Sequence, residues 1–347
     1  MSSDRSADVL VVGGGIVGLC TAWAAAASAS RSVALLERGK IGHAKGSSSG
    51  DSRMRVLAAY PDGSYIMRGI AAGEDWLRVE QAFRRPLLQT TGCLSWGSGQ
   101  EDLLGGLSRH DLPHEVWAQQ DVARAYPAVR LPRDVTAIHQ PDGAIIHADR
   151  ALAAFAGQAR NRGIAIHEGV AVTAIRPSEH SVEIESSAGA WSAGQLMVCA
   201  GPWTHRLLQT VGISLPLTMT SQTVCYFPYP DPSPPGMIQY GDSDPYALLS
   251  PARGLKAALH APGPLVDPDD RLRPDGQAAR HTAHWVRERF GDAVRGVRFR
   301  IETCVYTSTT DERFLIERHG PIIVVSACSG HGFQYAPETG RRAAALL

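Results

Sequence analysis

Two stretches of the sequence contain residues whose types and spacing could support redox chemistry. In the first, Gly13, Gly15 and Gly18 are spaced G-x-G-x-x-G between an apolar segment and an alanine-rich one. Glycines at these positions allow a tight turn, a close approach of backbone to a pyrophosphate, and close packing of a helix on a sheet. Glu37 follows Gly18 by 19 residues, where a carboxylate can accept hydrogen bonds from both ribose hydroxyls. These residues predict a βαβ unit that binds NAD or FAD.

The second stretch, Arg300 to Phe314, reads RIETCVYTSTTDERF and places Cys304 in a strand-like alternation. A small thiol in a strand is more often a core side chain than a reactive group. A cofactor that needs a covalent partner would reverse that expectation, because a thiolate is a strong nucleophile. Packing and covalent attachment are both open on these residues alone.

The composition is that of an ordinary globular protein. The chain has 347 residues, 44% of them hydrophobic, which allows a sizeable core in two domains. Lys plus Arg and Asp plus Glu number 34 each, so no net charge would attract nucleic acid, and the expected partner is a small molecule.

The cysteines show no metal-ligand spacing, so no metal is expected, and they fit reduced thiols in a cytoplasm. Val9 to Ser30 carries no charged side chain, but its glycines favour a nucleotide turn over a membrane span or a secretion signal.

The remaining pattern predicts the elements that must position these groups. Strands are expected over 8–12, 32–36, 164–167, 170–175, 182–185, 195–199, 215–227 and 321–326, and helices over 151–162 and 277–290. Asp149 is the expected amino cap of the first of these helices, and Gly163 follows its end. The Ala200-Gly201-Pro202-Trp203 turn would bring backbone close to a ligand again.

In this order, the segments resemble the monomeric sarcosine oxidase and N-methyltryptophan oxidase family, flavoenzymes of the D-amino-acid-oxidase superfamily. The resemblance covers nearly the whole chain. It is carried by VVGGGIVG from Val11, GDSR from Gly50, AGPW from Ala200, GLK from Gly254, CVYTSTTDE from Cys304 and SGHGF from Ser329. It implies an α/β protein, α+β overall. A glutathione-reductase-like Rossmann domain for FAD would comprise 1–85, 141–214 and 312–347, and a substrate domain with an antiparallel sheet would comprise 86–140 and 215–311.

The resemblance also implies roles for individual residues. FAD would be bound covalently, its 8α carbon joined to the sulfur of Cys304, with Arg53 as the cation that favours the thiolate. Lys256 matches a lysine beside the flavin that activates oxygen, because a fixed ammonium stabilises nascent superoxide. The expected catalytic residues are Lys256, Arg53, His260 and His331, the two histidines being equally compatible with a structural role. The other expected cofactor contacts are Arg38, Ser49, Ser52, Val172, Gly201, Trp203, Gly330, Gly332, Phe333 and Gln334.

The chain departs from the family where the substrate would bind. Family members hold an amino-acid carboxylate with a second arginine shortly after the first and a lysine after the Gly-His-Gly-Phe turn. Here the second arginine is Arg55, one position early, and Gln334 replaces the lysine. In an extended segment Arg53 and Arg55 share a face, so Arg55 is expected to reach the pocket, together with Tyr246 and Gln334. The alternative is a substrate without the usual α-carboxylate arrangement.

The expected function is therefore oxidation of a secondary or cyclic amine to an imine by a cytoplasmic monomer that reduces O₂ to hydrogen peroxide and binds no membrane. A biosynthetic imine oxidase resembling piperideine-carboxylate oxidase and a flavin dehydrogenase with another electron acceptor are alternatives. A non-catalytic flavin-binding protein is disfavoured, since it would need neither Lys256 nor Cys304. The sequence stops at Leu347, within what reads as the last helix of the cofactor domain, which suggests a truncated or naturally short carboxyl terminus.

Overall fold

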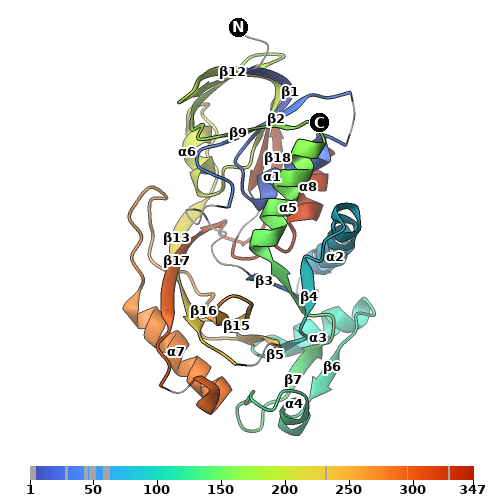
Figure 1. The fold of residues 1–347 in the computed structure, drawn as a ribbon, viewed down its shortest axis with the longest axis vertical. Helices are drawn as coiled ribbons and strands as arrows, with labels where there is room; N and C mark the ends of the chain where they lie inside the picture. Colours follow the sequence, from blue (N-terminus) through green and yellow to red (C-terminus); the bar gives the residue numbers. More distant parts are fainter. Residues whose placement is uncertain are drawn as a thin grey trace.

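The computed structural model describes residues 5–27, 30–42, 46, 52–57, 63–230, 233–294, 296–326 and 329–347. The molecule is elongated, and its first and last described strand and helix, β1 (Ser6–Val12) and α8 (Ala336–Ala344), both lie in its upper part (Figure 1). Each of the two parts is built on a sheet of eight strands, and a small three-stranded sheet lies between them. None of the helices in the described ranges has the length and apolar character needed to cross a membrane.

The upper sheet contains the predicted βαβ unit. β1 (Ser6–Val12) and β2 (Val33–Glu37) are parallel, and α1 (Ile16–Ala25) connects them. The strand order is β10-β11-β12-β1-β2-β9, and β19 pairs with β12 and carries β18 beyond it. The other strands are β9 (Ala165–Glu168), β10 (Val172–Pro177), β11 (Val182–Ser186), β12 (Gly189–Val198), β18 (Leu315–His319) and β19 (Ile322–Ser326).

Apolar residues on both sides of β1 give this sheet a core on each face. Val9 and Val11 join a cluster with α1, α5 (Ala148–Asn161) and α8 (Ala336–Ala344). Leu10 and Val12 point the other way, toward α6 (Thr204–Gln209). Parallel strands that are covered on both faces are apolar throughout, which explains why this segment resembled a membrane span.

The helix predicted over 151–162 differs at its start. α5 begins at Ala148 after His147, so Asp149 lies inside the first turn and the predicted amino cap is wrong. A carboxylate in the first turn still interacts favourably with the positive end of the helix, which is the signal that sequence reasoning took for a cap. Gly163 follows the helix end with φ of 78°, as predicted.

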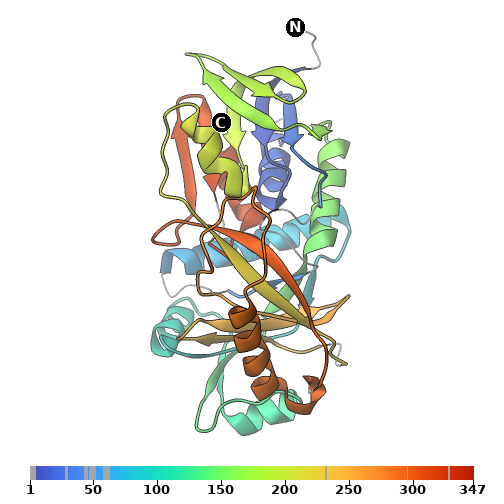
Figure 2. The same cartoon turned by 90° about the vertical axis from the view of Figure 1, so that its left-hand side faces the viewer.

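The lower sheet has the order β17-β13-β16-β15-β14-β5-β7-β6. Its neighbours are antiparallel except for the β5–β14 pair. α7 (Gly276–Phe290) packs on one face of this sheet, as Figure 2 shows. The strands are β5 (Cys93–Gly97), β6 (Glu115–Trp117), β7 (Ala137–Gln140), β13 (Thr218–Phe227), β14 (Gly236–Tyr240), β15 (Pro245–Ser250), β16 (Gly254–Leu259) and β17 (Arg300–Ser308).

The small sheet joins the two parts. It has the order β3-β8-β4, formed by Ser52–Arg55, Ala144–His147 and Leu88–Thr90. The remaining helices are α2 (Gly63–Phe83), α3 (Gln100–Arg109), α4 (Gln119–Ala125) and the short η2 (Gly201–Trp203) and η3 (Gly291–Val294). Sheet membership is compatible with the division into two domains given above, whose exact boundaries stay a prediction.

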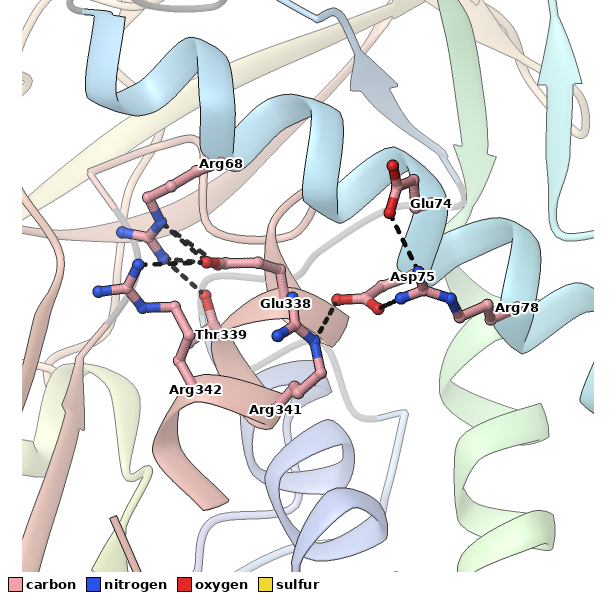
Figure 3. A network of polar contacts seen from close by, with 8 residues as sticks. All are labelled: Arg68, Glu74, Asp75, Arg78, Glu338, Thr339, Arg341 and Arg342. Carbon is pink, nitrogen blue, oxygen red and sulfur yellow. Dashed lines mark hydrogen bonds and ion pairs between the residues drawn. The ribbon is translucent and has the colours of Figure 1, made fainter. Parts of the chain in front are cut away.

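A polar network fixes the last helix against α2 (Figure 3). Glu338, which is 2% exposed, forms an ion pair with Arg68 at 2.8 Å, and Arg341 contacts Asp75 at 3.0 Å. A carboxylate in the first turn of α8 also favours the helix amino terminus. Because α8 directly follows residues 329–335, this network holds in place a turn that contributes to the candidate site.

Candidate active site

A first cavity, of about 360 Å³, lies at the carboxyl ends of β1 and β2. Ligands of doubly wound sheets bind in this place, because the loops after parallel strands leave a crevice there. The predicted cofactor residues that line it are Gly13, Gly15, Glu37, Arg38, Val172, Gly201 and Trp203. We call it the nucleotide cavity.

The three glycines of the G-x-G-x-x-G motif have different physical tasks. Gly13 has φ of 110°, and a Cβ there would lie 2.3 Å from the carbonyl oxygen of Cys199. A Cβ on Gly18 would lie 1.9 Å from the carbonyl oxygen of Gly13. Gly15 has nothing within 4 Å of the same position and stands just before α1. Gly13 and Gly18 are thus required by the fold, whereas Gly15 leaves room for a phosphate at a helix amino terminus.

Glu37 is held rigidly at the end of β2. It is 5% exposed, and its two carboxylate oxygens accept hydrogen bonds from the backbone N–H groups of Gly14 at 2.6 Å and Gly39 at 2.7 Å. A carboxylate has lone pairs for further donors, so ribose hydroxyls can be added to this arrangement. The residues present therefore fit the adenosine half of FAD.

Sequence reasoning missed a charged cluster at the edge of this cavity. Asp269 accepts hydrogen bonds from Arg38 at 3.0 Å, Trp203 Nε1 at 2.9 Å and Arg206 at 2.5 Å, while Arg206 also contacts Asp267 at 2.6 Å. The Arg38 guanidinium lies 4.3 Å from the Trp203 ring centroid. Asp267 and Asp269 belong to a proline- and aspartate-rich stretch, 261–276, and nothing in the sequence of such a stretch indicates which side chains it meets. We call these five residues the Asp269 cluster.

A second cavity, of about 260 Å³, is lined by residues of the small sheet, the lower sheet and the turn before α8. We call it the amine cavity. The predicted residues that line it are Arg53, Tyr246, Lys256, His260, Gly330, His331, Phe333 and Gln334. Residues that the sequence did not single out are Met54, Val56, Ile238, Tyr240, Asp244, Leu248, Tyr306 and Glu312.

Two cations converge on one wall of the amine cavity. Lys256 is 4% exposed, and its Nζ donates a hydrogen bond to the carbonyl oxygen of Ser52 at 3.1 Å. Arg53 Nη1 donates to the same oxygen at 2.7 Å, and its guanidinium lies 5.6 Å from the Phe333 ring centroid. Two positive charges beside one buried carbonyl create a positive potential that favours any negative charge developing nearby.

Two histidines lie together elsewhere in the cavity. The ring centroids of His260 and His331 are 4.5 Å apart, and His331 Nδ1 donates to the carbonyl oxygen of Ser329 at 2.9 Å. Burial lowers the pKa of both rings, that of His331 to about 3, so both are neutral at pH 7. A Cβ on Gly330 would lie 2.4 Å from His260 Cε1, so only glycine lets this turn approach so closely.

Cys304 lies beside the amine cavity but does not line it. It is 6% exposed in β17 and packs in one cluster with Tyr246 and Tyr306, which do line the cavity. Burial, with a smaller effect of Cys304, raises the pKa of Tyr246 to about 12. The thiol therefore belongs to a cluster of side chains that extends to the wall of the cavity.

The structure does not bring Arg55 into the amine cavity, contrary to expectation. Its Nη1 donates to the carbonyl oxygen of Asp142 at 3.1 Å, and its guanidinium lies against Gly73 of α2. Arg55 pairs with Ala144 at the far end of β3. Its side chain therefore does not reach the pocket, although it shares a strand face with Arg53. Gln334 does line the cavity, but its Oε1 accepts from the backbone N–H of Val56 at 3.0 Å.

A few predicted cofactor residues have other positions. Gly18, Ser52 and Gly332 line neither cavity, although Ser52 contributes its carbonyl oxygen to the cationic wall. Ser49 lies outside the described residues.

The chain is similar to known proteins over nearly its whole length. Residues 8–346 match the FAD dependent oxidoreductase family, and the chain belongs to it. The peroxisomal sarcosine oxidase of Mus musculus is 32% identical over 358 residues, which cover 96% of this chain and 90% of that one. The monomeric sarcosine oxidase of Bacillus sp. (strain B-0618) is 25% identical over 352 residues, with the same coverage of 96% and 90%.

Among solved structures, the open form of NikD, an unusual amino acid oxidase essential for nikkomycin biosynthesis, has the same fold. It superposes with a TM-score of 0.88 at 24% identity, over 99% of this chain and 94% of that one. The predicted family, the predicted fold class and the prediction of an FAD-dependent oxidoreductase are thereby confirmed.

Proposed function

We propose that this enzyme oxidises a secondary or cyclic amine to an imine in the amine cavity and passes the electrons to O₂, which gives hydrogen peroxide. The observation that carries the proposal is the buried Lys256 ammonium next to Arg53, in a cavity that also holds two neutral histidines. The names of its sarcosine oxidase relatives support an amine as substrate. FAD, when bound, accepts the hydride equivalent from the carbon beside the amine nitrogen and reduces O₂.

FAD would bind with its adenosine half in the nucleotide cavity and its flavin ring toward the amine cavity. Glu37 would accept hydrogen bonds from the ribose, and Gly15 with the start of α1 would face the pyrophosphate. The flavin end would lie toward Arg53, Lys256 and Phe333. Cys304 is the proposed point of covalent attachment, since it packs with Tyr246 and Tyr306, which line that cavity.

The protein's own side chains would act mainly through charge. Lys256 stabilises the negative charge that forms when O₂ takes an electron, and it is held for this by the Ser52 carbonyl. Arg53 adds to the same positive potential, which also disfavours a protonated amine beside it. An amine must be neutral for its lone pair to assist hydride loss, so activity should rise with pH through the pKa of the bound amine.

The setting of the reaction is part of the proposal. The enzyme would act as a monomer, as the name of one relative suggests, on a small-molecule amine. The five free cysteines of the described ranges, all of them buried, suit a reducing compartment such as the cytoplasm.

Two measurements test the proposal. The first is acid precipitation of the purified protein, which should leave the yellow colour with the pellet and move it to the supernatant in Cys304→Ala. Colour in the wild-type supernatant would overturn covalent attachment while leaving FAD in place.

The second measurement is anaerobic mixing with N-methyl and cyclic amines, which should bleach the flavin absorbance. If none of these amines bleaches the flavin, amine oxidation is overturned.

A further inference from the structure

The charges that line the amine cavity are separated in space. The described lining residues include two carboxylates, Asp244 and Glu312, besides the cations Arg53 and Lys256. Asp244 lies in the loop that joins β14 to β15, and Glu312 follows β17. The cavity therefore has a cationic wall at Ser52 and an acidic end contributed by other segments of the chain.

The register of the lower sheet places the acidic end away from the cationic wall. Lys256 of β16 pairs with Leu248 of β15, and the backbone N–H of His260 donates to the carbonyl oxygen of Asp244 at 3.1 Å. Asp244 thus lies four residues farther along the hairpin than Lys256. At about 3.3 Å per residue this is roughly 13 Å, room for an extended chain of several carbon atoms.

Among the described lining residues, no cation at the acidic end is available to bind a substrate carboxylate. Both cations of the described lining donate to the Ser52 carbonyl, and Arg55 lies outside the cavity. Gln334 carries no charge, and its Oε1 accepts from the backbone N–H of Val56. A substrate carboxylate would meet Asp244 and Glu312 instead, and like charges in a confined site repel.

We propose that the preferred amine carries a second, protonated amino group and no carboxylate, and that Asp244 and Glu312 bind this group. The inference rests on the proposed oxidation of an amine in this cavity. The reacting nitrogen would face the cationic wall, where its neutral form is favoured. The alkyl chain would pass the apolar and aromatic side chains of Ile238, Tyr240 and Leu248.

The pKa of Glu312 is consistent with this assignment. Partial burial and the nearby Asp244 carboxylate raise the pKa of Glu312. The same carboxylate opposes the effect of burial on His260, whose pKa is lowered overall. A bound ammonium would relieve the repulsion between the two acids. Asp244 is fixed for this by its Oδ1, which accepts from the backbone N–H of Gly241 at 2.6 Å.

Three amines of equal chain length test the proposal with the FAD-loaded enzyme. They are N-methyl-1,4-diaminobutane, N-methylpentylamine and 5-(methylamino)pentanoic acid, which end in a cation, a methyl group and a carboxylate. We expect kcat/KM to fall by about tenfold from the cation to the neutral amine, and again to the acid, since tenfold corresponds to one modest charge interaction. The rate of anaerobic flavin reduction should follow the same order.

Substitutions then assign the preference to the acidic end. Asp244→Asn and Glu312→Gln should each lower the ratio of kcat/KM for the cationic to that for the neutral amine by about fivefold, which is typical of a partly exposed charge. Asn at 244 preserves the oxygen that accepts from Gly241 and tolerates the positive φ of 40° found there. Asp242→Asn and Asp311→Asn, neighbours that do not line the cavity, should leave the ratio unchanged.

The outcomes separate this inference from the proposed function. If the neutral amine bleaches the flavin but the cationic amine gains nothing, or if the acid is preferred, the acidic-end assignment is overturned and amine oxidation stands. An unchanged ratio in both Asp244→Asn and Glu312→Gln would also overturn it. If none of the three amines reduces the flavin, while other secondary amines do, the cavity binds a different amine and the assignment fails; if no amine does, the proposed function fails.

Discussion

The nucleotide cavity and the amine cavity are built in opposite ways. In the first, the glycines and the carboxylate expected to bind the nucleotide lie within one short stretch, from Gly13 to Glu37, and more distant segments complete the lining. The second is assembled from side chains that are far apart in sequence, such as Arg53, Lys256 and His331. A cofactor common to many proteins can be bound by a short backbone motif, whereas a particular substrate needs charges that only the tertiary fold brings together.

The Asp269 cluster at the edge of the nucleotide cavity and the cationic wall of the amine cavity differ in how exposed their charges are. At the nucleotide cavity, the side chains of Arg38 and Asp269 are 43% and 41% exposed. In the amine cavity, Lys256 is 4% exposed. Exposed charges are screened by water and salt, while a buried charge acts at full strength. Substitution of Lys256 should therefore have a large effect on chemistry, and substitutions at the edge of the nucleotide cavity should have small effects on binding.

The largest effect is expected for Lys256→Met. Loss of the buried ammonium should slow reoxidation of the reduced flavin by O₂ about 100- to 1000-fold, as for removal of a preorganised charge stabiliser, and slow flavin reduction far less. Stopped-flow mixing of the reduced enzyme with O₂ measures the first rate. Lys40→Met, which removes a lysine of the nucleotide cavity, is the control and should leave reoxidation unchanged. Equal slowing of reduction and reoxidation would remove the contrast between the cavities.

Two glycine substitutions test the backbone side of the comparison. Gly13→Ala places a Cβ 2.3 Å from the Cys199 carbonyl oxygen at positive φ, so we expect the free energy of unfolding of the apoprotein to fall by about 2–4 kcal/mol. Gly15→Ala meets nothing within 4 Å and has φ of −71°, so it should change that free energy by less than about 0.5 kcal/mol and weaken FAD binding instead. Urea denaturation and FAD titration measure the two effects. Equal destabilisation by both changes would contradict the division of tasks.

The same contrast explains what could be predicted from the sequence. The βαβ unit was predictable because Gly13, Gly18 and Glu37 act locally, and each leaves its signal within one strand–helix–strand unit. The strand around Cys304 was equally visible from alternation. Asp149 was assigned as a cap because a first-turn carboxylate and an amino cap look alike in sequence.

The side chains that meet across the fold could not be predicted in the same way. Arg55 shares a strand face with Arg53, yet the edge of the small sheet turns it toward α2 and the Asp142 carbonyl. Asp244 and Glu312 lie in loops where acidic residues are ordinary, and only the packing of β15, β16 and the segment after β17 brings them to one cavity. Asp269 reaches Arg38 across 231 positions of the chain, a contact that no local pattern encodes.

Stability should also depend on pH through the amine cavity. The folded protein lowers the pKa of His331 to about 3, chiefly by burial, so the unfolded state binds the proton first as pH falls below 6.5. The free energy of unfolding therefore keeps its full value above pH 6.5 and falls progressively toward pH 3. About 2 kcal/mol of it is lost by pH 5. Urea denaturation at pH 7 and at pH 5 measures this difference. The free energy of unfolding should fall less between the two pH values in His331→Asn than in the wild type. The exposed His180→Asn is the control, and a loss that is identical in His331→Asn would contradict this assignment.

The smallest effect is expected at the Asp269 cluster. Asp269→Asn removes ion pairs that are about half exposed, each worth about 0.2–1 kcal/mol, so the Kd for FAD should rise only about two- to fivefold at low salt. The Kd is measured in Cys304→Ala apoprotein, because FAD then binds reversibly even if it becomes covalently attached in the wild type. Asp267→Asn, which contacts Arg206 but not Arg38 or Trp203, should change the Kd less. Because salt screens exposed pairs, the effect of Asp269→Asn should vanish at about 1 M NaCl. A loss of FAD affinity that persists at high salt would show that this edge acts as a buried charge does, and the distinction drawn between the two cavities would fail there.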